Sequence, residues 1–556
     1  MFFSSLAVIL AFLIAGSVFT GGLSAAGEAV LGWTNRYLGW FSIVSTTFIL
    51  GFAAWLMCGR FGRVRLGPDT SRPEFGTWSW FAMLFTAGMG IGLVYYGVYE
   101  PVYLTANPGY GGVGADPAGD PPPLSEQAAA EAMNATFFHW GLHPWAIYSV
   151  LGAALGYLCF RKGLPLRPAS ALYPLIGNRV HGWAGSLVDV LAVFCTVFGL
   201  ATSLGIGTRQ INAGLALLYG LPNEWWSQLA IVAAITAVAV TSLMLGLNRG
   251  IRPLSVAAMA LAAVLLTLVF ASGPTLYVLT RLIDSTGHYL QHLPETSLAV
   301  ADPATDGAGF GYQSLWTLFY WGWWISWSPF VGMFMARVSY GRTIREFIAG
   351  AMLAPAGVSV AWFGVFGWAG IYYDSREGAG ISAESADHAV FALLESLPIG
   401  GGVLYTLVAL LVLAAVVLFF ATSSDSGSLV VDMLTNGSDP HPVKAQRLLW
   451  ALIQGLVAAV LIVSGVAGPA GVADPILTLQ LVATGVTGLP FAVVLVLVCV
   501  GLARALRSED VDPPAPRGPG AAAAGGPEAL ADDPAEPEGP PPGGHRRRAP
   551  GGSGAP

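Results

Sequence analysis

The sequence is dominated by long apolar runs, and these limit its fold more than any other feature. A helix needs about 20 mostly apolar residues to cross the hydrocarbon core of a bilayer. About twelve such runs follow one another, at residues 3–22, 38–58, 78–99, 132–160, 186–218, 227–247, 254–275, 313–336, 345–372, 401–433, 446–467 and 475–503. Only 10% of the residues are charged, against roughly a quarter in ordinary soluble domains. We therefore predict an all-α integral membrane protein with about twelve transmembrane helices.

The basic residues indicate how these helices are oriented. The first run has no Lys or Arg before Arg36, so it lacks the basic segment of a signal peptide and is expected to remain as a helix. Lys and Arg gather in cytoplasmic loops. If both termini lie inside, 21 of the 25 basic residues fall in inner segments, and the exceptions are Arg36, Arg209, Arg281 and Arg376. We expect a multi-pass protein of the cell membrane with both termini in the cytoplasm.

The polar stretches between and after the runs do not predict a further folded domain. The outer loop at 102–130 and the tail from about residue 508 are rich in Gly and Pro, which is typical of disorder. The outer stretches 276–312 and 375–399 are mixed in polarity and are expected to hold short interfacial helices, such as one over 388–397. The net charge of -7 gives no reason to expect a nucleic-acid partner.

The third run contains a cluster of glycines that should weaken its helix. The segment AGMGIGLVYYGVYEP at 87–101 includes Gly88, Gly90 and Gly92, and each Gly destabilises a helix by up to ~1 kcal/mol relative to Ala. Unwound backbone at bilayer depth is tolerated where it faces protein or a water-filled cavity, and its free carbonyls can bind a cation there. Small residues also let helices pack closely. This segment alone leaves both interpretations open.

Aromatic residues are concentrated in two of the runs. Five of the 18 tryptophans lie in WTLFYWGWWISW at 316–327. If this segment is helical, one face with an arc of about 100° holds Trp316, Tyr320, Trp323, Trp324 and Trp327, and Trp321 is the one tryptophan of the segment that points elsewhere. In FFHWGLHPWAIY at 137–148 a face of about 140° holds Trp140, Trp145 and Tyr148, and Pro144 should loosen the helix. An aromatic belt at the membrane interface is the usual explanation. Two aromatic walls can also form a cage for a quaternary ammonium ion through cation–π contacts.

The tenth run ends in hydroxyl residues, LFFATSSDSGS at 418–428. Hydroxyl and carbonyl oxygens suit an alkali cation, but such hydroxyls also bond back to their own helix or join helices together. His139 and His143 have the spacing of a metal pair, yet no third ligand is evident and no metal other than an alkali ion is expected. The four cysteines are expected to be buried thiols. No catalytic motif appears, so an enzyme is not expected.

These segments together resemble the betaine/carnitine/choline transporter family. The resemblance is carried by FYWGWWISWSPFVGMFMARVSYGRTIREF at 319–347, with the glycine, aromatic and hydroxyl segments above, and runs from about residue 38 to 505. It implies LeuT-like inverted five-helix repeats formed by helices 3–12, two extra N-terminal helices, and assembly as a homotrimer. The corresponding division of the chain is 1–74 for the extra helices, 75–505 for the transporter core and 506–556 for the tail.

The resemblance also implies which residues form the binding sites. The substrate would lie among aromatic residues of the fourth and eighth helices: Trp140, Trp145, Tyr148, Trp324 and Trp327, with Trp321 and Trp323 nearby. A coupling sodium ion would be held between the third and tenth helices, by Thr86, Met89, Phe419, Thr422 and Ser423. A second sodium site is matched by Thr196 and Phe330, although Leu200 stands where another hydroxyl is expected.

The expected function is therefore secondary transport. We expect sodium-coupled uptake of a small quaternary ammonium osmolyte, with glycine betaine as the first candidate, and no organic cofactor. The sequence also allows uptake of choline or carnitine, by proton symport or by exchange. A receptor or channel would need a folded sensor domain or a repeated pore helix, and the sequence predicts neither.

Overall fold

A computed structural model of the chain describes residues 2–108, 122–245, 252–399, 402–436, 444–466 and 487–509. The described residues all belong to the first of two units, residues 1–511. The centre of the predicted outer loop, the start of the last predicted helix and the predicted disordered tail lie outside the described residues. Within the described ranges every regular element is helical, and a single isolated β-bridge joins Arg65 to Thr343. The all-α prediction is confirmed for this part of the chain.

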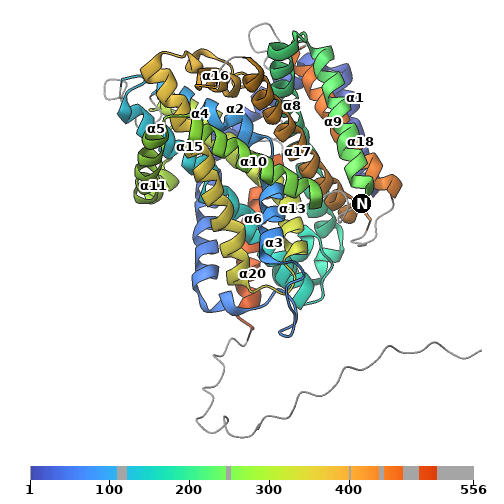
Figure 1. Ribbon diagram of the computed structural model, residues 1–556. Coiled ribbons are helices and arrows are strands. Elements are labelled where there is room, and N and C mark those ends of the chain that lie inside the picture. Colours follow the sequence, from blue (N-terminus) through green and yellow to red (C-terminus); the bar gives the residue numbers. More distant parts are fainter. Residues whose placement is uncertain are drawn as a thin grey trace, which may run out of the picture. The chain divides into compact units, whose positions relative to one another are not determined.

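Figure 1 shows the helices of the first unit, coloured along the chain. The α-helices are α1 (Phe2–Val18), α2 (Thr20–Cys58), α3 (Thr77–Gly88), α4 (Gly92–Ala106), α5 (Glu126–Trp140), α6 (Leu142–Leu155), α7 (Tyr173–Ile176), α8 (Trp183–Tyr219), α9 (Trp225–Leu245), α10 (Arg252–Ser272), α11 (Thr275–Leu298), α12 (Gly307–Leu315), α13 (Thr317–Val338), α14 (Ile344–Ile348), α15 (Ala354–Glu377), α16 (Ala389–Ser396), α17 (Gly402–Thr435), α18 (Lys444–Val466) and α20 (Leu489–Leu506). Short 3-10 helices lie at Arg60–Arg63, Pro168–Leu172, Gly177–His181 and Ile381–Ala383, and π-helical turns at Gly156–Arg161 and Ala349–Leu353.

Nine helices within the described residues are long and apolar enough to cross a membrane. The other predicted spans differ for identifiable reasons. The third run is divided between α3 and α4, and α1 has only 17 residues. Helix α13 has 22 residues rich in Trp. In the ranges given above the protein is therefore all-helical, with nine helices long and apolar enough to cross a membrane, and the count of twelve and the inverted repeats stay predictions.

Two predicted irregularities are present, and one expectation was wrong. The fourth run is interrupted at Gly141, between α5 and α6, because Pro144 has no N–H to donate to the carbonyl of Trp140. The expected interfacial helix over 388–397 is α16. The stretch 276–312 does not contain only short helices, since α11 runs for 24 residues. Its polar and apolar faces allow a long helix to pack against α5 and α15.

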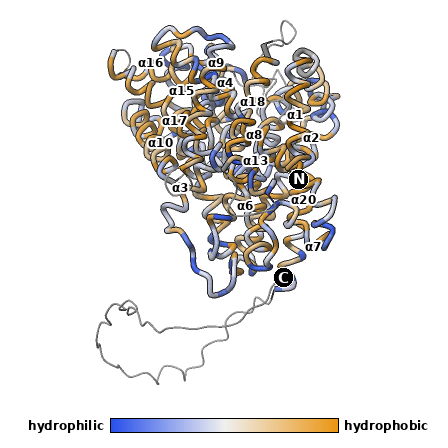
Figure 2. Tube along the Cα trace, turned by 90° about the vertical axis from the view of Figure 1, so that its right-hand side faces the viewer, coloured by the Kyte–Doolittle hydropathy of each residue, from blue (hydrophilic) through white to orange (hydrophobic). Residues whose placement is uncertain are grey.

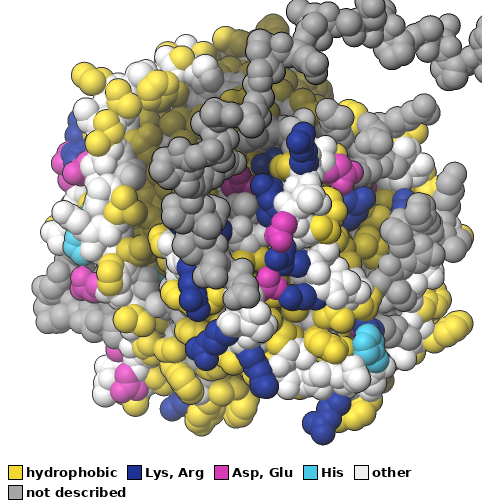
Figure 3. All heavy atoms as spheres, turned by 90° about the horizontal axis from the view of Figure 1, so that it is seen from below, with side chains coloured by type: hydrophobic (Ala, Val, Ile, Leu, Met, Phe, Trp, Pro, Cys, Tyr) yellow, Lys and Arg dark blue, Asp and Glu magenta, His cyan; other side chains and the backbone are white. Residues whose placement is uncertain are grey.

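The charged loops meet at two ends of the bundle. At one end Arg345 donates to the carbonyls of Met57 and Gly59, 2.8 and 3.1 Å away, and Arg65 donates to that of Gly341 at 2.8 Å. Viewed from this end, Lys and Arg side chains are gathered together (Figure 3). At the other end Glu126 pairs with Arg281 and Arg376. The loops around Arg65 and Arg345 therefore share one end, and Glu126, Arg281 and Arg376 share the other, as predicted. Which end faces the cytoplasm stays a prediction.

The interior is centred on α13, which packs against α6, α8, α17 and α3. Hydrophobic residues run along the lengths of the helices, and hydrophilic residues gather in the loops at their ends (Figure 2). Nearly every residue of α13 is buried, including Trp321, Trp323, Trp324 and Trp327. An interfacial aromatic belt would leave these rings at the membrane surface. Their burial instead places the tryptophans of α13 inside the protein.

Candidate substrate and cation sites

The glycine-rich third run is unwound in its middle. Helix α3 ends at Gly88, and Met89 has φ −114° and ψ 111°, which is extended backbone. The Met89 N–H still donates to the carbonyl of Phe85 at 2.8 Å, and helical bonding resumes where Val94 donates to Ile91 at 3.0 Å. The predicted break is confirmed.

Each glycine of this segment lies against a different tryptophan. A Cβ atom added to Gly88 would be 2.6 Å from the ring of Trp145. One added to Gly90 would be 2.6 Å from Trp327, and one added to Gly92 would be 2.6 Å from Trp140. A Cβ does not fit at these distances unless a ring or the backbone shifts, so these three positions require glycine. The segment is thus both unwound and closely packed against indole rings, and cation binding by its carbonyls stays a prediction.

The two aromatic walls meet around this segment, and we call this set of rings the aromatic cage: Trp140, Trp145 and Tyr148 from α5 and α6, and Tyr320, Trp323, Trp324 and Trp327 from α13. The rings of Trp323 and Trp324 are stacked with centroids 4.8 Å apart. Trp140 meets Trp324 edge to face at 4.9 Å, so the walls of α5 and α13 are in contact. All seven rings are buried. The sequence-predicted aromatic residues of both runs are therefore brought together.

The polar atoms of the cage fall into two groups. Trp140 donates its indole N–H to Glu100 at 2.7 Å, and Trp324 donates to the carbonyl of His139 at 3.0 Å. Within the cage, four buried donors have no hydrogen-bond partner among the described residues: the indole nitrogens of Trp145, Trp323 and Trp327 and the hydroxyl of Tyr148. Buried donors are rarely left without an acceptor. Such a set can receive the anionic group of a ligand.

Trp321 stands apart from the cage. It stacks on His143 with centroids 5.3 Å apart and meets Phe138 edge to face at 5.0 Å. This agrees with its predicted position off the aromatic face of the helix. The other histidine of the pair, His139, lies 2.7 Å from Glu100. The described residues contain no cluster of three or more His, Cys, Asp or Glu suited to a metal ion.

The hydroxyl residues of the tenth run lie on α17, which packs against α3. Thr422 and Ser423 are buried, and both donate to the carbonyl of Phe419 at 2.9 Å. Thr86 donates to Ala82 at 2.8 Å. These hydroxyls therefore bond back to their own helices. Each hydroxyl oxygen still has lone pairs that can ligate a cation. The helices are thus adjacent as expected, and the sodium role of these residues stays a prediction.

The residues of the suggested second sodium site lie on two helices that pack together, Thr196 on α8 and Phe330 on α13. Thr196 donates to Ala192 at 2.8 Å, and the ring of Phe330 contacts that of Trp327 at 5.2 Å. Leu200, which stands where a hydroxyl is expected, lies against Gly427 of α17. Leu200 therefore fills space between helices and offers no ligand oxygen.

Sequence reasoning missed one residue of this region, Glu100. It is fully buried on α4 and hydrogen-bonds to His139, Trp140 and Tyr320. The available signal was a single carboxylate inside an apolar run, because ionisable residues within membrane spans are rare and usually functional.

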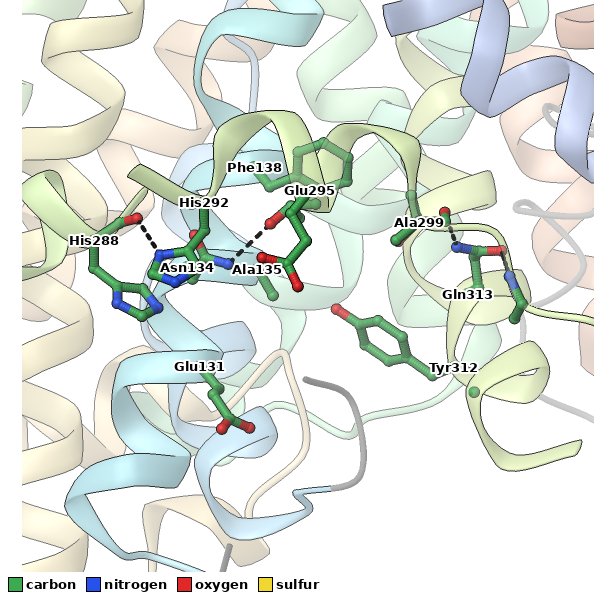
Figure 4. A pocket seen from close by; sticks show the side chains of 14 residues that line it. Glu131, Asn134, Ala135, Phe138, His288, His292, Glu295, Ala299, Tyr312 and Gln313 are labelled. Carbon is green, nitrogen blue, oxygen red and sulfur yellow. Dashed lines mark hydrogen bonds between the residues drawn. The ribbon is translucent and has the colours of Figure 1, made fainter. Parts of the chain in front are cut away.

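A pocket of about 420 Å³ lies beside the cage, between α5, α11 and α12. Figure 4 shows Glu295 and Tyr312 pointing into its centre, with Glu131 and His288 at its rim. Its lining includes Thr317, whose hydroxyl lies 3.0 Å from Nε2 of His139. Two acidic residues, Glu131 and Glu295, line the pocket together with the buried ring of Phe138.

Membrane-length helices around an unwound segment, with a buried binding site beside it, are typical of membrane transporters. The betaine/carnitine/choline family transporter model matches residues 1–511. The chain therefore belongs to the betaine/carnitine/choline transporter family, as the sequence motifs predicted.

Several curated relatives are similar over most of the chain. A glycine betaine transporter of Acinetobacter baylyi is 40% identical over 91% of this chain and 73% of its own length. The glycine betaine transporter OpuD of Bacillus subtilis is 36% identical over 92% and 94%. A glycine betaine/proline/choline transporter of Vibrio parahaemolyticus is 39% identical over 91% and 89%. A solved sodium-coupled sialic acid symporter aligns with 78% of this chain and 79% of its own, at 10% identity and a TM-score of 0.42, which is too distant to bear on the helix count.

Proposed function

We propose that this protein imports glycine betaine, or a closely related trimethylammonium compound, together with sodium. The observation that carries the proposal is the contact between the unwound segment and the cage, where Gly88, Gly90 and Gly92 lie against Trp145, Trp327 and Trp140. A trimethylammonium group has no N–H to donate, so it is recognised by aromatic faces through cation–π contacts. The names of the relatives from Acinetobacter and Bacillus support the same substrate.

The two groups of polar atoms suit the two ends of a zwitterion. Trp140 and Trp324 already donate to protein acceptors, so they offer ring faces to the ammonium end. Trp145, Tyr148 and Trp327 have no partner among the described residues, so they can donate to a carboxylate. A buried donor without an acceptor costs about 1–3 kcal/mol, and a bound carboxylate would remove this cost. Glycine betaine has both ends, whereas choline has no carboxylate.

We propose that sodium binds between α3 and α17, to the oxygens of Thr86, Met89, Phe419, Thr422 and Ser423. Met89 is extended, so carbonyls near it are available outside a helical ladder. Phe419, Thr422 and Ser423 lie within one and a half turns of the facing helix. We further propose inverted repeats, a homotrimer, residence in the cell membrane, and cytoplasmic termini, on the resemblance to the family and the distribution of basic residues.

Competition in a reconstituted uptake assay tests the substrate. The purified protein is placed in liposomes, uptake of labelled glycine betaine is started by an inward sodium gradient, and unlabelled betaine, choline, carnitine and a sulfonium analogue are added in turn. We expect betaine to compete at the lowest concentration and choline more weakly. The relative from Vibrio carries proline and choline in its name, so choline is included as a labelled substrate as well. Equal competition by all four compounds would contradict a role for the carboxylate donors.

A further inference from the structure

Glu100 occupies an unusual position for a carboxylate. It lies on α4, the helix that begins at Gly92 directly after the unwound segment. Its side chain is fully buried, and an ionised carboxylate without partners at such a depth would be strongly destabilising. A residue of this kind persists because its neighbours satisfy it or because the protein uses it.

Three donors converge on this one carboxylate. Its Oε1 lies 2.7 Å from Nδ1 of His139. Its Oε2 accepts from the indole N–H of Trp140 at 2.7 Å and from the hydroxyl of Tyr320 at 2.6 Å. These distances are typical of charge-assisted hydrogen bonds, which are stronger and more directional than neutral ones. Oε2 therefore holds one ring from each wall of the aromatic cage, Trp140 from α5 and Tyr320 from α13.

The remaining ring on this side depends on the same group. Tyr320 stacks on Trp324 at 12° between ring planes, and Trp140 meets Trp324 edge to face. Trp324 also donates to the carbonyl of His139, whose ring contacts Glu100. The carboxylate thus fixes Trp140 and Tyr320 directly and Trp324 through both of them. The donors of Trp145, Tyr148 and Trp327 have no such restraint among the described residues.

We propose that Glu100 is a positioning residue that sets the orientation of Trp140 and Tyr320 for recognition of the quaternary ammonium group. The inference rests on the proposed function, because it assumes that these rings contact the substrate. Glu100 itself does not touch the substrate in this arrangement, since its two oxygens are directed at the three donors. Its effect passes through the rings.

A double-mutant cycle between Glu100 and Trp140 tests this role. Glu100→Gln is isosteric but cannot accept from all three donors, because its amide nitrogen can only donate. We expect the KM for glycine betaine uptake and the Kd from equilibrium binding to rise roughly tenfold, with the maximal rate within about twofold of wild type. Trp140→Phe keeps a ring and removes the N–H. If Glu100 acts through that N–H, the double variant is no weaker than the weaker single variant.

A matched cycle supplies the control. Trp145→Phe removes an indole N–H of the same cage that has no contact with Glu100. Its effect should multiply with that of Glu100→Gln, because the two sites share no hydrogen bond. If the increases in KM of the single variants multiplied in both cycles, or if Glu100→Gln left KM unchanged, the positioning role would be overturned.

Two further variants separate positioning from folding. Tyr320→Phe removes one of the hydrogen-bond donors to Glu100 and should raise KM by a few fold. It tests the same role if Glu100→Gln does not fold. Asp189→Asn alters another buried carboxylate, which pairs with Arg167 and accepts from the N–H of Ala169. Asp189→Asn should lower the melting temperature and leave KM unchanged. If its KM were as high as that of Glu100→Gln, the KM increase in Glu100→Gln would reflect a general loss of packing and the positioning role would be overturned.

The failure of the proposed function can be told apart from the failure of this inference. A wild-type protein that binds no quaternary ammonium compound would overturn the proposed function. An active wild type together with an unchanged KM in Tyr320→Phe would overturn only the inference.

Discussion

At the scale of single residues, the two sides of α13 have different neighbours. Trp324 lies within the aromatic cage, 4.9 Å from Trp140, while Trp321 lies against Phe138 and His143. Both side chains are fully buried and have the same size. Replacing each with the same residue therefore compares a cage position with a packing position on one helix.

Trp324→Ala should raise the KM for the ammonium substrate by a factor of roughly 5–30, which corresponds to the loss of a cation–π contact of ~1–2 kcal/mol. Trp324→Phe should cause much less damage because a ring face remains. Trp321→Ala should reduce the amount of folded protein more than it changes KM. The measurement is initial uptake against substrate concentration, normalised to folded protein. Equal effects of Trp324→Ala and Trp321→Ala on KM would show that the cage is assigned to the wrong face.

The residues of the cage could be predicted because tryptophan is rare and its helical spacing places it on one face. Glu100 could not be predicted from the same pattern, since its partners Trp140 and Tyr320 are 40 and 220 positions away along the chain. Cys58 was expected to be a buried thiol but is exposed at the end of α2, because an apolar neighbourhood in the sequence does not fix which face of a helix is covered.

At the scale of elements, the unwound segment between α3 and α4 depends on having no side chain at three positions. Gly90→Ala would place a methyl group 2.6 Å from Trp327, so the ring or the backbone would have to move. We expect substrate binding to weaken by at least tenfold, although Ala favours a helix. Gly357→Ala on α15 is the control, because nothing lies within 4 Å of its added Cβ. Equilibrium binding of labelled betaine measures both, and tolerance of Gly90→Ala would be incompatible with the close approach described.

A second element-scale prediction concerns the end of α20. Burial of the Glu509 carboxyl opposes ionisation, but hydrogen bonds from Lys162, Arg161 and Tyr157 outweigh it and lower its pKa from 4.5 to about 2. A lowered pKa stabilises the folded state above pH 4.5, and this contribution is lost as the pH falls toward 2. Glu509→Gln should therefore lower the melting temperature by a few degrees at pH 7.

The same variant should melt like the wild type at the acid end of that range, where Glu509 becomes protonated in both the folded and the unfolded protein. Added salt should also reduce the difference, since Lys162 is partly exposed. Melting curves at pH 7, 4.5 and 2 measure this. A constant difference at all three values would mean that the ionised carboxylate is not the stabilising group.

Helix positions followed from the sequence where apolar runs are continuous, and breaks followed from Gly and Pro. The length of α11 did not follow, because its polarity is mixed and its stability comes from packing against α5 and α15. The contact of Glu509 with Arg161 also joins residues 348 positions apart. Such contacts are fixed by the tertiary arrangement of the helices.

At the scale of the whole molecule, the distribution of basic residues predicts the orientation in the membrane. The loop contacts place Cys58 at the same end as Arg345, which donates to its carbonyl. Asn107, which is exposed, begins the loop at the other end. In intact cells an impermeant maleimide should label Asn107→Cys and leave Cys58 unlabelled until the cells are made permeable. Labelling of Cys58 from outside, with Asn107→Cys protected, would reverse the orientation.

The proposed coupling also belongs to the whole molecule, because it needs α3 and α17 to act together. Each sodium ion that moves down a potential of about 100 mV supplies ~2.3 kcal/mol, enough for roughly fiftyfold accumulation of a net-neutral zwitterion. Removing both hydroxyls as Thr422→Ala with Ser423→Ala should raise the sodium concentration for half-maximal uptake. It should also weaken betaine binding, since coupling between two ligands is reciprocal.

The most direct test is accumulation of labelled glycine betaine in liposomes that contain the purified protein, compared with sodium or with potassium outside. With an inward sodium gradient and an inside-negative potential, the internal concentration should rise well above the external one and fall when the gradient is collapsed. The Thr422→Ala, Ser423→Ala variant should accumulate little at low sodium. Equal uptake when potassium replaces sodium would contradict sodium symport and favour exchange or proton coupling.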